Sequence, residues 1–121
     1  MLGGSKIIAF AATADSASAR AFYEGMLGLR FVSEDLFAIV YDAGGVELRI
    51  QKVPALTPQP HTQLGWSVPS IEKVVEELGR RGAVFEKYSS HGIWTAPSGA
   101  KVAWLKDPDG NLLSLTEHLS N

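Results

Sequence analysis

The chain has 121 residues, of which 45% are hydrophobic and 20% are charged, and its formal net charge at pH 7 is −2. This length fits one domain with its own hydrophobic core. A small negative charge without a basic run argues against nucleic acid or an anionic membrane as the partner, and the absence of cysteine excludes disulfides and thiolate chemistry. No apolar run approaches the roughly 20 residues that span a bilayer, and the start MLGGSKIIAF lacks a signal-peptide pattern, so we expect a soluble cytoplasmic protein.

The first half of the chain, about 5–53, is predicted to form a βαβββ unit. The predicted elements are a strand over 6–13, a helix over 17–26, a strand beginning in LGLRF, and strands over 37–41 and 46–51. Asp15 or Ser16 can cap the helix, and Gly28 can end it. The last two strands are joined by DAGG, whose paired glycines suit a hairpin turn.

The second half, about 62–118, repeats this order after a linker over 54–61, PALTPQPH, in which the prolines disfavour regular structure. The predicted elements are a strand over 63–68, a helix that Ser70 caps and that ends at about 79–82, and strands over 84–87, 92–95, 101–106 and 112–116. An apolar stripe at helical spacing gives that helix one buried face. The repetition predicts two modules within a single domain, 1–121.

The closing hairpin, AWLKDPDGNLLSLTEH, shows how the faces of this sheet are divided. Pro108 fixes one corner of the turn, Asp107 can accept hydrogen bonds from amides just ahead, and Gly110 suits the left-handed conformation that closes the loop. In the last strand the side chains at 113 and 115 share one face, and those at 112, 114 and 116 share the other. We expect the first face to pack against helices and the second to line a cleft.

The order and spacing of three motifs now identify a resemblance. TADSASARAFYEGMLGLRF resembles the first-helix signature of the vicinal oxygen chelate superfamily, WLKDPDGNLLSL resembles its closing hairpin, and GGVELRI lies between them in the expected place. This superfamily includes glyoxalase I, extradiol dioxygenases and bleomycin-resistance proteins. The resemblance spans nearly the whole chain and implies an α+β fold, in which two βαβββ modules form a curved mixed sheet around a cleft. It also implies a homodimer.

The resemblance further implies a place for a divalent metal, because enzymes of the superfamily hold one with a residue from each of four strands. Motif by motif, those places fall on Ile8, Glu47, Gln63 and Ser114. Glu47 can bind a hard cation and Gln63 offers a weak amide oxygen, but an isoleucine has no lone pair and a neutral serine hydroxyl is a poor donor. We therefore expect no metal and no other cofactor.

The histidines leave alternatives open. His61 and His118 would share a face with the third and fourth metal positions if a strand were longer or its register shifted, but we interpret both as exposed residues at strand ends. His91, in SSHGIW, neighbours a predicted cleft strand and is a candidate proton carrier. The alternative is an ordinary loop histidine.

Without a metal, the cleft depends on shape and on a few polar side chains. Alternation puts Glu47 and Arg49 on the cleft face of their strand, where they pair with each other or with a ligand. Trp104 is expected on the cleft face of its own strand, and the residues on either side of it are expected to face the helices. The remaining candidate ligand-binding residues are Gln63, Ser114, Trp94 and Tyr41.

Three functions are compatible with these residues. The first is a metal-free small-molecule-binding protein of the bleomycin-resistance kind, which holds a planar or aromatic ligand between tryptophans in a dimeric cleft. The second is an enzyme, a glyoxalase-like lyase, an isomerase or a dioxygenase-related protein, in which Glu47 is the general base or a metal ligand and His91 assists. The third is a structural or regulatory module with a vestigial cleft, against which the lack of a second domain argues.

Overall fold

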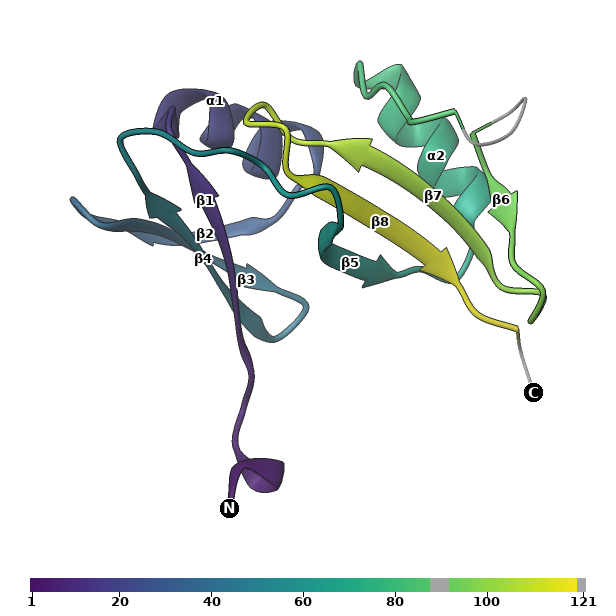
Figure 1. The fold of residues 1–121 in the computed structure, drawn as a ribbon, viewed down its shortest axis with the longest axis horizontal. Helices are drawn as coiled ribbons and strands as arrows, with labels where there is room; N and C mark the ends of the chain where they lie inside the picture. The colour runs from purple at the N-terminus through teal and green to yellow at the C-terminus, as the bar shows by residue number, and fades with distance from the viewer. Residues whose placement is uncertain (88–91, 120–121) are drawn as a thin grey trace. The chain divides into compact units, whose positions relative to one another are not determined.

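The computed structural model describes residues 1–87 and 92–119 of the chain (Figure 1). The chain divides into two compact units, Met1–Thr57 and Pro58–Asn121, and the division falls inside the proline-broken segment 54–61. Each unit is described by itself. Within the described residues, no helix is long and apolar enough to cross a membrane.

The first unit contains a βαβββ module in which one mixed sheet is formed. After a short 3₁₀ turn, η1 (Leu2–Gly4), its elements are β1 (Ile8–Thr13), α1 (Ser16–Arg20), the π-helical η2 (Ala21–Met26), β2 (Arg30–Glu34), β3 (Ala38–Ala43) and β4 (Val46–Lys52). The strand order is β1-β4-β3-β2, with β1 parallel to β4 and the other pairs antiparallel. β1 and β4, which are far apart in the sequence, are therefore neighbours at one edge of this sheet.

The second unit repeats this arrangement. Its elements are β5 (Thr62–Ser67), α2 (Ile71–Arg80), β6 (Trp94–Thr95), β7 (Lys101–Lys106) and β8 (Leu112–Glu117). The strand order is β5-β8-β7-β6, with β5 parallel to β8. The predicted α+β class and the repeated βαβββ order are confirmed.

The first helix begins where the sequence predicts it. The side chain of Asp15 accepts hydrogen bonds from the backbone N–H of Ser18 at 3.2 Å and from its hydroxyl at 2.8 Å, and these bonds hold the pKa of the Asp15 carboxyl below its ordinary value. After Arg20 the helix widens, with the amide of Leu27 bonded to the carbonyl of Phe22 five residues back. Gly28, at φ 75°, ends it as expected.

The second helix is capped from a strand and not by its own N-cap side chain. Ser70 stands at the N-cap of α2, but its hydroxyl makes no capping hydrogen bond. Instead the amide of Ile71 donates to Glu117 Oε1 at 2.8 Å. Because Glu117 is the last residue of β8, this bond ties the start of α2 to the end of that strand. The sequence prediction that Ser70 caps the helix is corrected in this respect.

The predicted strand over 84–87 is also corrected. In the described part of the chain this segment forms an isolated bridge, Phe85 to Leu105, and one hydrogen bond from the amide of Glu86 to the carbonyl of Trp104. β7 pairs through the same edge with β6, whose residues lie opposite 101–102. Two short segments share this edge, so neither extends into a long strand.

The turn between β7 and β8 forms as its residues predict. Asp107 is buried, and its Oδ1 accepts hydrogen bonds from the amides of Asp109 and Asn111 at 3.0 and 2.9 Å. Asn111 adds a side-chain bond to the other oxygen of Asp107 at 2.8 Å. Gly110 has φ 90°, which favours glycine. These hydrogen bonds fix the tip of the hairpin, and the fixed tip sets the register between β7 and β8.

Each sheet has one buried face. In the first unit Leu48 and Ile50 are buried, and in the second unit the buried apolar positions of the two hairpin strands are Ala103, Leu105, Leu113 and Leu115. α2 packs against β7 and β8 on this side (Figure 1). The alternate residues of the same strands remain half-buried or exposed. The alternation predicted from the sequence thus separates a core face from an open face in each unit.

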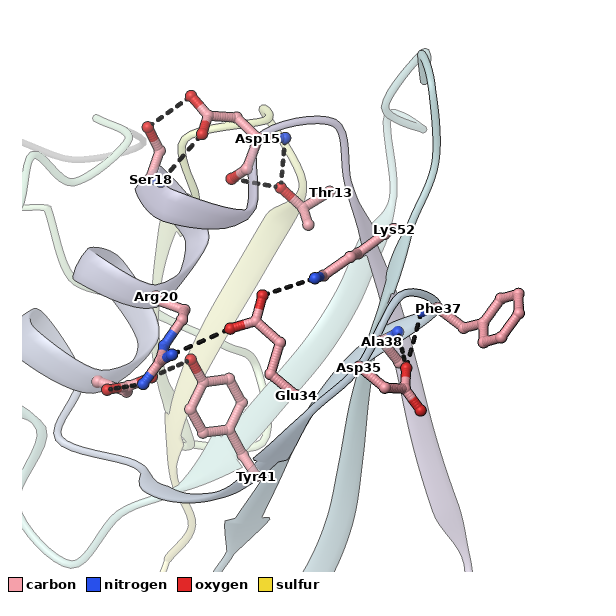
Figure 2. Close-up of polar contacts among 11 residues, drawn as sticks. Thr13, Asp15, Ser18, Arg20, Glu34, Asp35, Phe37, Ala38, Tyr41 and Lys52 are labelled. Carbon is pink, nitrogen blue, oxygen red and sulfur yellow. Dashed lines mark hydrogen bonds and ion pairs between the residues drawn. The ribbon is translucent and has the colours of Figure 1, made fainter.

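A polar network joins the helical segment of the first unit to its sheet (Figure 2). Arg20 contacts Glu24 at 2.6 Å and Glu34 at 3.0 Å, and Lys52 contacts the second oxygen of Glu34 at 2.6 Å. The hydrogen bond from Lys52, with that from Arg20, holds the pKa of Glu34 below its ordinary value. The network lies on the helix-covered side of the first unit. Its two positive side chains, Arg20 and Lys52, balance the carboxylates of Glu24 and Glu34.

Candidate functional site

The open face of the second sheet carries the aromatic residues of the candidate site. In register, Trp104 of β7 lies opposite Ser114 of β8, which in turn lies opposite Gly65 of β5. Trp94 of β6 pairs with Val102. Since residues 102 and 104 lie two apart on one strand, the two indoles project from the same face.

These tryptophans line a cavity of about 710 Å³. The other residues that line it are Pro60, His61, Thr62 and Leu112. The parallel pairing of Thr62 with Leu112 brings the entrance of β5 beside the closing hairpin. Pockets of about 300–1,000 Å³ lined mainly by apolar and aromatic side chains are typical of small-molecule sites.

The geometry of the indole pair limits how a ligand can bind. The ring centroids of Trp94 and Trp104 are 6.0 Å apart and their planes are inclined by 40°. A flat ring inserted between them would need two contact distances of about 3.5 Å, or about 7 Å in all. The indoles as they stand leave less than this distance between their rings, and the expectation that a ligand lies between two tryptophans stays a prediction. Trp94 is 40% exposed, so its indole offers an outer face to a ligand.

Ser114 and Gln63, both predicted to bind a ligand, lie outside the described lining of this cavity. A Cβ atom at Gly65 would lie 2.7 Å from Ser114 Oγ, so the serine hydroxyl occupies the space beside the glycine. Gln63 is the additional residue of a β-bulge between Thr62 and Leu64. The bulge removes Gln63 from register with β8, and Gly65 takes the place opposite Ser114.

In the first unit, Glu47 and Arg49 form the ion pair that the sequence predicts. Arg49 Nη1 lies 3.3 Å from Glu47 Oε2, with the two side chains 33% and 44% exposed. Across the parallel pairing, Ile8 lies opposite Glu47 and Phe10 lies opposite Arg49. Asp42 lies opposite Glu47 and pairs with Arg30, so this open face presents two ion pairs beside apolar side chains.

Tyr41 does not belong to an open face, so the structure gives no support to its assignment as a ligand-binding residue. It pairs with Leu48 on the core side of the sheet and is completely buried. Its hydroxyl donates to Glu24 Oε1 at 2.9 Å (Figure 2). Burial and this bond to a carboxylate raise the pKa of the Tyr41 hydroxyl. Tyr41 is a core residue that joins the helical segment to β3.

The histidines differ in position. His91, the candidate proton carrier, lies outside the described residues. His118 is exposed and absent from the described cavity lining. His61 is exposed as predicted but lines the cavity, which the sequence analysis missed. The pairing of Thr62 with Leu112 brings His61 to the cavity, and alternation along a single strand gives no signal of it.

Taken together, the described geometry is that of an α+β protein with paired βαβββ modules and an open aromatic pocket on one sheet. The model of the glyoxalase-like domain family matches residues 8–116, and the chain belongs to this family. This confirms the resemblance to the vicinal oxygen chelate superfamily. No curated protein matches the chain significantly.

Solved structures share the fold at low sequence identity. A bleomycin resistance determinant encoded on the transposon Tn5 is 23% identical, with a TM-score of 0.75 over 96% of this chain and 99% of that chain. The fosfomycin resistance protein FosX from Listeria monocytogenes is 12% identical, with a TM-score of 0.77 over 96% and 94%. A lactoylglutathione lyase from Agrobacterium tumefaciens is 16% identical, with a TM-score of 0.75 over 93% of each.

The residues at the metal positions that the resemblance implies do not fit a divalent metal. In the first unit, Ile8 stands opposite Glu47 and offers no donor atom. In the second unit, Ser114 stands opposite a glycine. Among the described residues, no group of three or more histidine, cysteine, aspartate or glutamate side chains could hold a metal ion. We derive no chemistry through a metal at these positions.

Proposed function

We propose that this protein binds small molecules without a metal, in the manner of the bleomycin-resistance members of its superfamily, and that it holds a planar or aromatic ligand on Trp104. The observation that carries the proposal is the cavity on the open face of the second unit, where the indoles of Trp94 and Trp104 meet. Buried aromatic contacts of this kind supply much of the affinity for flat ligands.

One feature supports a binding role over catalysis. The polar groups of the described cavity lining are an imidazole, a threonine hydroxyl and the indole N–H groups, without a carboxylate. The fold alone does not decide between the two roles, because a solved bleomycin resistance determinant and a solved lactoylglutathione lyase both have it. We take from them the general role of binding a small compound. A screen of planar compounds by tryptophan fluorescence tests it directly, because bound ligand changes the emission of an indole that it covers.

We also propose that the chain forms a homodimer. A closed, two-fold symmetric dimer is the commonest assembly of soluble proteins, and the resemblance implies one. Light scattering at micromolar concentration should give twice the 13.0 kDa mass of one chain. A mass of one chain at all concentrations would contradict this.

The alternative is an enzyme of the same superfamily, a lyase, isomerase or dioxygenase-related protein, that uses Glu47 as its base. The observation that favours it is the partly exposed carboxylate of Glu47, held 3.3 Å from Arg49 on an open sheet face. A carboxylate in reach of a substrate can accept a proton.

Glu47→Gln separates these functions. For a binding protein the change removes only a partly exposed ion pair, so we expect the free energy of unfolding to shift by less than about 1 kcal/mol, and ligand affinity to stay the same. For an enzyme, glutamine keeps the shape of the side chain but cannot take the proton, so turnover would be abolished while affinity persists. Urea unfolding and calorimetric titration of the variant check the first outcome. Any turnover that disappears in Glu47→Gln contradicts it.

A further inference from the structure

His61 is the feature of the pocket that the sequence analysis set aside and the proposed function does not use. It follows Pro60 and precedes Thr62, the first residue of β5, and it lines the cavity with both tryptophans. Among the described lining residues it is the one whose side chain can carry a charge. None of the hydrogen bonds or ion pairs in the described residues engages its imidazole.

One charged residue near the pocket already has an ionic partner. Lys106 lies opposite Leu112 at the same end of the sheet, and its Nζ is 3.3 Å from Glu86 Oε1. This pair contributes little net charge to the cavity. Among the described lining residues, His61 therefore has the side chain that can supply charge to this end.

The chemistry of the lining discriminates among ligand classes. A cationic ligand would be held by a carboxylate or a cage of several aromatic faces, but the described lining contains two indoles and no acid. A pure hydrocarbon would cover the imidazole of His61 and the hydroxyl of Thr62 without giving either a hydrogen-bond partner, which is unfavourable. A ligand with an anionic group at this end gives the imidazole a charge-assisted bond.

We propose that His61 is the specificity-determining residue of this pocket and that it selects a planar aromatic carboxylate. The ring of the ligand lies across the outer faces of Trp94 and Trp104, and its carboxylate reaches the imidazole at the entrance of β5. This inference rests on the proposed function, because it names the class of ligand that the same pocket takes.

The test uses three probes that share one flat ring system and differ in one substituent: naphthoate, naphthamide and naphthylmethylamine. Isothermal titration of the full chain should show that naphthoate binds about tenfold more tightly than naphthamide, the usual gain from a charge-assisted hydrogen bond. Naphthylmethylamine should bind most weakly. His61→Gln should bring the naphthoate and naphthamide affinities to within about twofold of each other, because the amide of glutamine can form a hydrogen bond but cannot take up a proton.

Two further variants make the test independent of folding defects. His61→Glu should reverse the order, so that the amine becomes the preferred probe, and a misfolded protein could not show this gain. His118→Gln is the matched control, because it removes an exposed histidine outside the described cavity lining. It should keep the preference of the unmodified protein for naphthoate.

The results that overturn the inference differ from those that overturn the proposed function. If naphthoate and naphthamide bind equally well and Trp104→Ala weakens both, the pocket is confirmed and the role of His61 is wrong. The role is also wrong if His61→Gln keeps the preference for naphthoate or if the unmodified protein prefers the amine. If no probe binds at all, both the proposed function and the inference fail.

Discussion

Trp104→Ala should weaken binding of the best planar ligand by an amount on the order of 1–3 kcal/mol, the usual effect of truncating an aromatic anchor. This corresponds to roughly fivefold to 150-fold in the dissociation constant. The indole of Trp104 lines the cavity and lies 6.0 Å from that of Trp94, so its removal leaves a ligand with one aromatic wall. Calorimetric titration measures the change.

Trp66 provides the control for this variant. It lies on β5 opposite Leu115, on the core side of the same sheet, and is absent from the described cavity lining. Trp66→Phe should therefore leave affinity within about twofold, since it changes no group that contacts the ligand. If Trp104→Ala leaves the affinity for every ligand unchanged, the pocket has been assigned to the wrong face.

Leu113→Ala should destabilise the protein by about 2–5 kcal/mol, because it removes a fully buried side chain and leaves a cavity behind. Ser114 is the next residue, but it projects from the opposite, open face. Ser114→Ala should change the free energy of unfolding by less than about 1 kcal/mol. Urea unfolding of the two variants compares the faces of one strand. Similar losses from both would contradict the assignment of a core face and an open face.

The features that the sequence predicts well are those that depend on neighbouring residues. The turn at Asp107 and Gly110 follows from local hydrogen bonding and backbone preference. Alternation along each strand predicts that Leu113 and Leu115 are buried. Each depends on a few consecutive positions, so the sequence itself carries the information.

The features that the sequence does not predict depend on pairing between segments that are distant along the chain. His61 reaches the pocket because Thr62 pairs with Leu112, some fifty positions away. Gln63 loses its register through a bulge, and alternation alone cannot locate a bulge. Tyr41 shares the core face of β3 because that strand pairs in register with β4. A shift of one residue would reverse each of these assignments.

Our central proposal is that the pocket of the second unit binds a ligand without a metal. Its basis is chemical, since Ile8 offers no donor atom and Ser114 only a neutral hydroxyl at the positions where the superfamily holds its ion. Binding that relied on an ion would depend on its presence, because a metal that holds the ligand contributes directly to affinity.

The most direct test is a calorimetric titration of the best planar ligand into protein that has been dialysed against a strong chelator. We predict that the protein has the same affinity for the ligand before and after dialysis, and that adding zinc, nickel, manganese or iron does not increase it. Loss of binding after chelation, restored by one divalent ion per chain, would contradict it.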